Sequence, residues 1–319
     1  MKKKILITSS TLPRWDKDTE PRFILDYAKS IQKYYDVTIL APAAVGAKDK
    51  EVIEGVEIVR YHYFPIHKWE TLCYPGAIVP RIREKKVRIL LVPFLLLSLW
   101  CRLLKINKNY DLVHAHWMIP QGMVQSVFHK TPYILTGHGG DITSLNFGFM
   151  KSIKKSAIKH ARHVTVVSDK LKEIVNGICP NDKTTVLPMG CDTSVFKTAN
   201  RVENFFGQGD KKVVLFVGRL AEVKGVEYLI KAVDKLDNVM LAIAGTGDLE
   251  GELKKIAKPM GDKVVFMGAK THSELSTIIP SSDVLVMPSV TASDGGKEGF
   301  GLVIIEAMAS GVPVVASNS

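Results

Sequence analysis

The sequence predicts an α/β protein with two domains, each built around a mainly parallel sheet. Short apolar segments with the length of buried strands alternate along the chain with segments of helical periodicity, as in repeated β-α-β units. A polar stretch at 198–212 interrupts this pattern, which starts again at Val213, and 319 residues are ample for two domains. We therefore expect a first Rossmann-like domain over 1–197, a linker over 198–212 and a second Rossmann-like domain over 213–319.

In the first domain, the expected strands are apolar runs that end in polar or glycine-rich turns. A helix is expected at Arg22–Lys33, where Phe23, Leu25, Ala28 and Ile31 recur at helical spacing. The expected strands are Lys4–Thr8, Val37–Ala41, Val56–Tyr61, Leu112–Ala115, Tyr133–Thr136, His163–Val167 and Thr185–Leu187.

The second domain repeats the alternation. Thr271 and Glu274 have the spacing of a capping box and predict a helix start. The other expected elements are strands at Val213–Val217, Val239–Ala244, Val264–Met267 and Asp283–Met287, and helices at Val226–Lys235 and Leu249–Ala257.

The net charge of +11 is concentrated in the first part of the chain. Residues 1–200 hold 30 basic against 17 acidic residues, whereas residues 201–319 hold 13 against 15. A basic half suits anionic lipid head groups, nucleic acid or a phosphorylated acceptor. Because the sequence has no basic repeat interleaved with aromatic residues and no zinc-ligand spacing, we expect no nucleic acid partner.

The cysteines and the N-terminus indicate a cytoplasmic protein. The four cysteines are scattered and form no Cys-x-x-Cys pair, as expected for reduced thiols. Three lysines precede Ile5–Ile7 and imitate a signal peptide, but the apolar run ends at Thr8, which is too short. We interpret this run as the first strand.

The segment Ile89–Cys101 is uncharged over thirteen residues, contains Pro93 and has basic residues on both sides. It falls short of the roughly 20 apolar residues of a spanning helix. Two interpretations stay open, a buried crossover helix or a helix that lies on a membrane surface.

The segment Lys297–Ala316 is the most informative in the chain. A glycine pair around Phe300 opens an apolar run that ends at Gly311, which predicts a loop, a short helix with a C-cap glycine and a strand. Glu298 lies in the loop and Glu306 in the helix. Free N–H groups at a helix start can hold an anion, and carboxylates accept hydrogen bonds from sugar hydroxyls. The segment therefore predicts a sugar-nucleotide site.

Two further turns predict contacts with a nucleotide. Arg219 and Lys224 follow an expected strand beside glycines, where two cations can hold a diphosphate leaving group. The turn Gly245-Thr246-Gly247 follows the next strand and also resembles a dinucleotide fingerprint, which makes an oxidoreductase a rival interpretation. That rival is weak, because the following strand ends without a carboxylate for a ribose.

In the first domain, His138 and Asp141 lie in a glycine turn at a strand end, where contact with substrate is expected. His114 and His116 alternate on a strand without an evident third ligand, so we expect a structural role rather than a metal site.

The loop after the first strand contains Asp16 and Asp18 in an Asp-x-Asp pattern. It lies away from the expected nucleotide turns, so we expect no metal there. Arg14 and Trp15 in the same loop are expected on the acceptor side, with a solvated loop as the equal alternative.

Together these segments resemble the retaining family-4 glycosyltransferases. Gly218–Gly225 matches the family's G-R-L-x-x-x-K-G motif, whose Arg and Lys contact donor phosphates. Glu298 and Glu306 match its E-x7-E signature. His138 and Asp141 match its His-Gly-x-Asp segment, in which the histidine lies beside the transferred sugar.

The resemblance implies a GT-B fold of two facing domains and retaining transfer of a hexose from a nucleoside-diphosphate donor. It implies no metal and no cofactor. The chain ends soon after a strand begun at Val312, where family members continue, so we expect a C-terminally truncated second domain. The implied catalytic residues are His138, Arg219, Lys224 and Glu298; the implied donor-binding residues are Gly245, Thr246, Gly247, Phe300, Gly301, Leu302 and Glu306; the implied acceptor-side residues are Arg14, Trp15 and Asp141.

We expect the acceptor to be lipid-linked or a cell-surface polysaccharide, with the protein attached to the inner face of a membrane through its basic domain. Two alternatives stay open. One is a sugar-nucleotide 2-epimerase with the same fold, and the other is an inactive fragment that binds a sugar nucleotide or a membrane. The sugar, the base and the acceptor are not predicted by the sequence.

Overall fold

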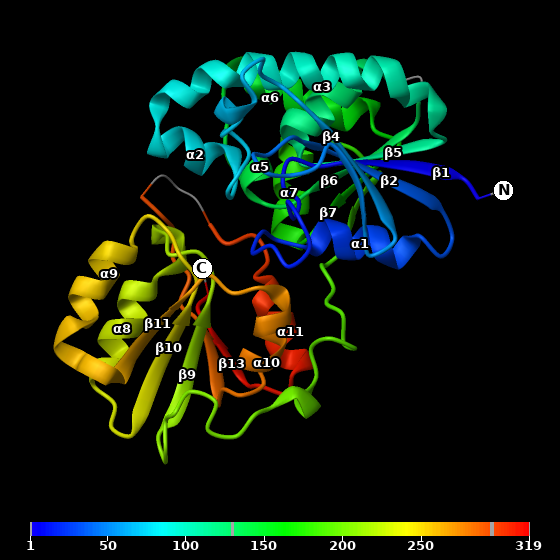
Figure 1. Cartoon of the computed structure of the whole chain (residues 1–319). Helices are drawn as coiled ribbons and strands as arrows, with labels where there is room; N and C mark the ends of the chain where they lie inside the picture. The colour runs from blue at the N-terminus through cyan, green and yellow to red at the C-terminus, as the bar shows by residue number, and fades with distance from the viewer. Residues whose placement is uncertain (1, 129–130, 294–296, 319) are drawn as a thin grey trace. The chain divides into compact units, whose positions relative to one another are not determined.

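The computed structural model describes residues 2–128, 131–293 and 297–318. The chain divides into two compact units, unit 1 (Met1–Pro188) and unit 2 (Met189–Ser319), each built on its own sheet (Figure 1). Two Rossmann-like sheets confirm the predicted fold class.

The sheet of unit 1 has the strand order β3-β4-β2-β1-β5-β6-β7-β8. Neighbouring strands are parallel except β3 and β4, which form an antiparallel hairpin. Strand β3 was not predicted from the sequence. The strands are β1 (Lys4–Thr8), β2 (Asp36–Pro42), β3 (Lys50–Ile53), β4 (Val56–Tyr61), β5 (Leu112–His116), β6 (Tyr133–Gly137), β7 (His163–Val166) and β8 (Thr184–Val186).

Helices cover both faces of this sheet. Ile5 and Ile7 of β1 pack with Ile24 and Leu25 of α1 on one face, and Figure 1 shows α3 on the opposite side of the sheet. The helices of unit 1 are α1 (Phe23–Ile31), α2 (Ile78–Glu84), α3 (Val92–Ile106), α4 (Met123–Gln125), α5 (Gly140–Thr143), α6 (Gly148–His160) and α7 (Asp169–Ile178), and 3-10 turns η2 (Lys86–Leu91) and η3 (Asn107–Asn109) flank α3.

The apolar segment Ile89–Cys101 lies within a continuous helical stretch, Lys86–Asn109. With 24 residues, this stretch is by length and composition long and apolar enough to cross a membrane, and no second one was found among the described residues. The expectation that the segment is too short was therefore wrong. Pro93 does not interrupt the helix, because it lies in the first turn of α3, where its missing N–H needs no partner.

The sheet of unit 2 has the order β11-β10-β9-β12-β13 with parallel neighbours. The capping box is formed, since the Glu274 N–H donates to Thr271 Oγ1 at 3.2 Å and the Thr271 N–H donates to the Glu274 carboxylate at 2.7 Å. The elements are β9 (Lys212–Val217), α8 (Val226–Asp234), β10 (Val239–Ala244), α9 (Glu250–Ala257), β11 (Val264–Gly268), α10 (His272–Ile278), β12 (Val284–Met287), α11 (Leu302–Ala309) and β13 (Val314–Ala316).

Strand β9 separates two apolar cores. Val214 and Phe216 pack with α8 and α9, whereas Val213 and Leu215 pack with α10 and α11. Figure 1 shows the same pairs of helices on the two sides of the sheet. In this doubly wound arrangement, the loops that follow the parallel strands gather at one edge of the sheet.

The two compact units divide earlier in the chain than the predicted domain boundary. We expected the first domain to reach residue 197 and a linker over 198–212, but residues from Met189 onward belong to unit 2. Phe196 is fully buried in the core of unit 2, and Asn200 and Arg201 donate to backbone carbonyls of residues 276–282. The polar stretch packs on unit 2 through hydrogen bonds, which an apolar pattern does not reveal.

Candidate functional site

The predicted donor residues of unit 2 follow strands around its topological switch point. β9 and β12 are neighbours in the sheet. From β9 the chain runs outward through β10 to β11, and it then returns to β12 on the other side of β9 and continues outward to β13. In open parallel sheets, ligands bind beyond the carboxyl ends of the strands at such a point. The loops after β9, β10 and β12 all lie at this edge.

Close backbone contacts join the loops after β9 and β10. A Cβ atom on Gly245 would lie 1.9 Å from the carbonyl oxygen of Gly218, and one on Gly247 would lie 2.4 Å from that of Leu220. The Gly245 N–H donates to the Gly268 carbonyl at 2.8 Å. The amide of Gly245 is therefore not available to a ligand, and this glycine is required by packing.

Lys224 and Glu298 form an ion pair, although 74 residues separate them in the sequence. Gly225 follows Lys224 with φ +61°, and a Cβ atom there would lie 2.0 Å from the carbonyl oxygen of Pro288. This glycine lets the loop after β9 approach the end of β12. Two of the predicted catalytic side chains are thereby brought together at one strand edge.

Arg219 lies on the same loop with an exposed side chain. Within the described part of the chain, its guanidinium has no hydrogen-bond or ion-pair partner. An exposed guanidinium beside a parallel strand end can bind a phosphate with two donors.

A cavity of about 180 Å³ adjoins Glu298. Ser289, two residues after the end of β12, lines it with a side chain that is only 5% exposed, and its hydroxyl has no partner in the described structure. Ser289 was not predicted from the sequence, although its place two residues after an expected strand at the switch point was a usable signal. The other lining residues are Met287, Gly299, Phe300, Ile304, Ala316 and Ser317.

The start of α11 borders this cavity. Gly301 is the N-cap with φ +79°, and α11 starts at Leu302 as predicted. The first N–H groups of a helix lack partners within it and favour an anion. Glu306 lies one turn further along α11, half-buried, and is not among the residues that line the cavity.

In unit 1, three histidines gather at the carboxyl ends of β5 and β6. Nδ1 of His116 and Nε2 of His138 are 2.9 Å apart, and the His114 and His116 rings lie 4.2 Å apart by their centroids. Phe23 and Trp117 contact the His138 ring edge-on or tilted, at 5.1 Å and 4.9 Å. The contact of His116 with His138 was not predicted.

Burial keeps these histidines neutral. It lowers the pKa of His138 to about 3 and, with a smaller contribution from His138, that of His114 to about 3. The pKa of His116 is also lowered well below its usual value, by burial first and then by the other two histidines. A neutral His138 can donate or accept a hydrogen bond but brings no positive charge.

We expect unit 1 to lose stability on acidification. The pKa of His114 is about 3 in the folded state and about 6.5 in the unfolded state. Between these two pH values the unfolded state binds more protons than the folded state, so the stability of the fold decreases as the pH drops below 6.5. The free energy of unfolding changes by about 1.4 kcal/mol per pH unit for each such histidine.

Urea unfolding measured between pH 7 and 5 should show a shallower dependence of this free energy on pH for His114→Gln than for the wild type. Thr165→Val, a buried change without a titrating group, should keep the wild-type slope; equal slopes in all three proteins would contradict this account.

Asp141 organises the loops around His138. Its carboxylate accepts from the N–H groups of His138 and Gly139, both at 3.0 Å, and of Met118 at 2.8 Å. Burial raises the pKa of Asp141, and these hydrogen bonds oppose that rise. This predicted acceptor-side residue thus positions the His138 turn.

Arg14 and Trp15 form a stacked pair, with the guanidinium carbon 4.4 Å from the ring centroid. Nε and Nη2 of Arg14 donate hydrogen bonds to the Asp18 carboxylate, at 2.8 Å and 2.7 Å. Asp18 is therefore engaged by Arg14 and by backbone N–H groups. The side chain of Trp15 is 41% exposed.

One group of possible metal ligands occurs among the described residues, His62, His67 and Glu70, with ligand atoms within 4.8 Å of one another. Both ring nitrogens of His62 already meet carboxylates, Glu70 at 2.6 Å and Asp49 at 3.0 Å. Although burial opposes it, the hydrogen bond and charge of Glu70, with those of Asp49, raise the pKa of His62. Both ring nitrogens of His62 are therefore occupied by carboxylates within the protein.

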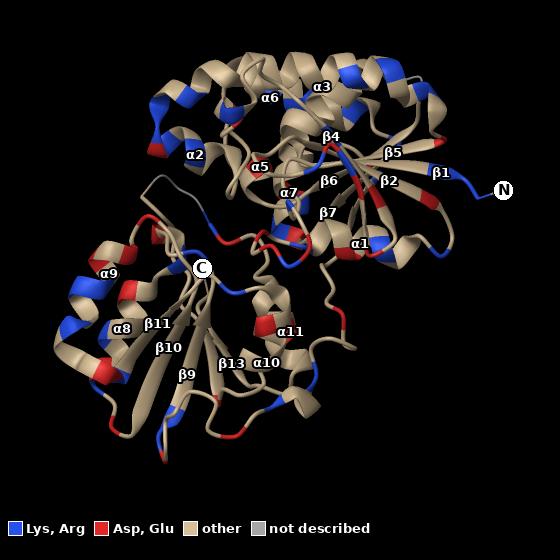
Figure 2. Ribbon diagram, viewed as in Figure 1, with Lys and Arg blue, Asp and Glu red and all other residues tan. Residues whose placement is uncertain are grey.

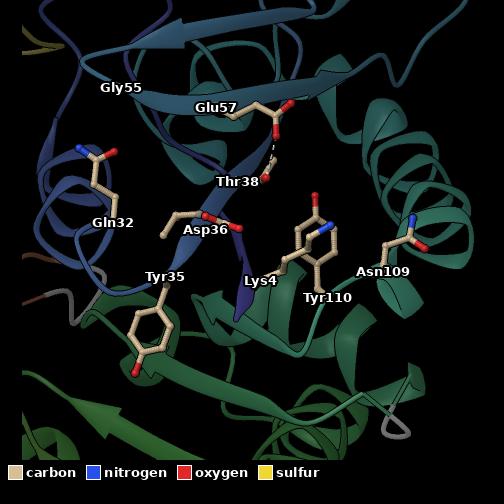
Figure 3. Close-up of a pocket in the computed structure, with 10 residues that line it drawn as sticks. Lys4, Gln32, Tyr35, Asp36, Thr38, Gly55, Glu57, Asn109 and Tyr110 are labelled. Carbon is tan, nitrogen blue, oxygen red and sulfur yellow. Dashed lines mark hydrogen bonds between the residues drawn. The ribbon is translucent and has the colours of Figure 1, made fainter. Parts of the chain in front are cut away.

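The larger cavity, about 500 Å³, lies in unit 1 at the opposite end of its strands (Figure 3). Lys4 and Asp36 begin β1 and β2, and Tyr110 precedes β5, so the cavity is at the amino ends of the parallel strands. The Glu57 carboxylate accepts from the Thr38 hydroxyl at 2.8 Å within it. None of the predicted site residues lines this cavity.

Comparison with known proteins assigns both units. Residues 21–195 match Glycosyltransferase Family 4, and residues 199–319 match Glycosyl transferases group 1.

Two curated relatives are an uncharacterized glycosyltransferase of Methanocaldococcus jannaschii, 33% identical over 66% of this chain, and a putative teichuronic acid biosynthesis glycosyltransferase of Bacillus subtilis, 31% identical over 65%. The aligned regions span 58% and 53% of the lengths of these relatives.

Solved structures share the fold over nearly the whole chain. Sucrose-phosphate synthase from Thermosynechococcus elongatus has a TM-score of 0.75 at 21% identity, covering 99% of this chain and 82% of its own. Anabaena HepE in complex with UDP and glucose has a TM-score of 0.72 at 18% identity, covering 99% and 81%. With the family match over more than half of its length, the chain belongs to the Family 4 glycosyltransferases and has a GT-B-like fold of two Rossmann-like units.

Proposed function

We propose that the protein transfers a hexose from a nucleoside-diphosphate sugar to an acceptor with retention of configuration. The observation that carries this proposal is the Lys224–Glu298 pair at the switch point of unit 2, beside the exposed guanidinium of Arg219. Cations for a diphosphate and a carboxylate for sugar hydroxyls are the groups that a nucleotide sugar requires at one place.

We assign protein residues to each part of the nucleotide-sugar donor. Arg219 and Lys224 bind the diphosphate and stabilise the charge that grows on it as the bond to the sugar breaks. Glu298 and the N–H groups of Phe300, Gly301 and Leu302 hold the sugar and a phosphate oxygen, and Glu306 accepts from the ribose hydroxyls. Thr246 and Gly247 line the nucleotide. Ser289, whose buried hydroxyl has no partner among the described residues, adds a donor to the sugar or phosphate.

No side chain is required as a nucleophile. The bond between the anomeric carbon and the phosphate oxygen breaks as the acceptor oxygen bonds to the same face of the sugar. The acceptor proton passes to the leaving phosphate. The enzyme contributes position and charge stabilisation, and neither a metal nor a cofactor enters the reaction.

Unit 1 contributes to the acceptor side. Neutral His138 is proposed to hydrogen-bond a sugar hydroxyl, and Arg14 and Trp15 are proposed to contact the acceptor. We propose a lipid-linked or polysaccharide acceptor and attachment to the inner face of a membrane. Two facts support this proposal, the basic excess of residues 1–200 and the exposed apolar helix of unit 1.

A donor screen tests the proposal. A nucleotide sugar at a hundred times its Kd stabilises the folded protein by about 2.7 kcal/mol, so one among the UDP-, GDP- and ADP-sugars should raise the unfolding midpoint. Lys224→Ala should abolish most of that rise. Stabilisation by none of the donors, or an equal rise in the variant, would argue against the site. A free epimerised nucleotide sugar formed without an acceptor would favour the epimerase.

A further inference from the structure

The helical stretch Lys86–Asn109 carries two apolar faces, of which the fold covers one. Leu95, Leu99 and Leu103, spaced four residues apart, are almost fully buried, and α3 contacts β4 and α4. Within this stretch, only 22% of an apolar window of 18 residues is buried. A core helix of a soluble protein would bury most of such a window, so the second face requires an explanation.

The second face is a continuous exposed stripe. Its residues are spaced three and four apart, which places them on one side of the helix over about 26 Å. The exposed fractions of Leu90 and Leu97 are 65% and 58%. The stripe, which we call the α3 surface, consists of Val87, Leu90, Phe94, Leu97, Cys101 and Leu104, with Ile89 and Trp100 also exposed beside it.

A neighbouring loop extends the α3 surface. Phe64 contacts the Phe94 ring edge-on at 5.0 Å and stacks on Trp69 at 5.8 Å. The side chains of Trp69 and Ile66 are 53% and 41% exposed. Tryptophan is favoured at the boundary between lipid tails and head groups, where its ring and its N–H are both accommodated.

The charges around the α3 surface fit an anionic bilayer. No charged residue occurs in Ile89–Cys101, and Figure 2 shows the uncharged middle of α3 between basic residues (Figure 2). Glu84, which lies among the basic residues before the segment, is paired with Arg81 and Arg88. The basic residues are Arg81, Arg83, Lys85, Lys86 and Arg88 before the segment and Arg102, Lys105 and Lys108 after it.

These features favour lipid over a second helix. A helix-pairing seam is narrow and has charged residues beside it. The α3 surface is instead widened by Ile89 and Trp100, with cations only at its ends. The buried row Leu95, Leu99 and Leu103 holds the helix along the sheet, so a spanning orientation would carry the sheet into the hydrocarbon.

We infer that the α3 surface, with Trp69 and Ile66, inserts into the head-group region of an anionic bilayer with the helix parallel to the membrane. The exposed leucines and Phe94 enter the boundary with the acyl chains, and the exposed lysines at the two ends of the helix, Lys85, Lys86, Lys105 and Lys108, contact lipid phosphates. This deepens the proposed lipid-linked acceptor, but the binding itself does not depend on sugar transfer.

Sedimentation with vesicles tests the inference. Vesicles of phosphatidylcholine with phosphatidylglycerol should bind the full chain, and Leu90→Ser/Leu97→Ser should weaken binding about tenfold or more. The matched control is Val52→Ser/Tyr34→Ser, which removes two apolar side chains of unit 1 that are 67% and 63% exposed; it should bind like the wild type. High salt or pure phosphatidylcholine should weaken the binding.

The other outcomes overturn the inference. These are no binding by the wild type, equal loss in the control double variant, resistance to extraction by alkaline carbonate as for a spanning helix, or a dimer that Leu90→Ser/Leu97→Ser dissociates. Donor-induced stabilisation, measured in parallel, separates the two proposals. Vesicle binding without stabilisation by a donor would contradict only the proposed sugar transfer. Stabilisation by a donor without vesicle binding would contradict only the proposed membrane contact of the α3 surface.

Discussion

Replacing Lys224 with alanine should lower the turnover of sugar transfer by about a hundredfold or more. The ammonium group of Lys224 is fixed by Glu298 at the end of the β9 loop, so it is in place before charge develops on the leaving diphosphate. Loss of one such preorganised group costs on the order of 10²–10³ in turnover. Initial rates with a saturating donor would measure it.

Lys231 provides a matched control. It also forms an ion pair, with Glu227 on the exposed side of α8. An exposed pair of this kind contributes little, so Lys231→Ala should keep nearly full activity. Similar activity of Lys224→Ala and Lys231→Ala would show that the pair at the switch point does not serve transfer.

The second large effect concerns Gly245. Replacing it with alanine should destabilise unit 2 by about 3 kcal/mol, because the new methyl group would lie 1.9 Å from the carbonyl oxygen of Gly218 at φ +145°. The loops after β9 and β10 would have to separate, which would also move Arg219. Urea unfolding followed by circular dichroism would measure the loss.

Gly251 is the comparison for this glycine. It lies in α9, where a methyl group added to its Cα would meet nothing within 4 Å, so alanine there should keep or raise stability by up to about 1 kcal/mol. Equal effects at Gly245 and Gly251 would mean that the close approach of the two loops does not limit the fold.

Most of the sheet strands could be predicted from the sequence because buried parallel strands are continuous apolar runs. β1, β4 and β10 have the predicted bounds, and α10 begins at its capping box. β3 was not predicted because Lys50–Ile53 has only four residues, two of them charged, and is an edge strand paired with β4.

The length of the helix that contains α3, and the face that packs on the sheet, could not be predicted from composition alone. The uncharged run Ile89–Cys101 is thirteen residues long, but the helix extends through charged residues to Lys86 and Asn109. Which of its faces the sheet covers follows from tertiary packing. The boundary at Pro188 was missed for a similar reason, since the burial of Phe196 in unit 2 has no local signature.

For the site, the sequence predicted the residue types and their strand ends. It did not predict that Lys224 and Glu298 would pair, since no local rule joins residues 74 apart. It also missed the packing requirement on Gly245 and the free hydroxyl of Ser289, which depend on neighbouring loops.

Hydrogen–deuterium exchange with and without a saturating donor nucleotide tests the central claim most directly, because it locates the ligand without assuming turnover. We predict slower exchange in unit 2, in peptides that contain Gly218–Gly225, Gly247–Glu250 and Phe300–Ile304. Protection confined to the large cavity of unit 1, at residues 36–38, 55–57 and 109–110, with unit 2 unchanged, would contradict the assignment of the donor site.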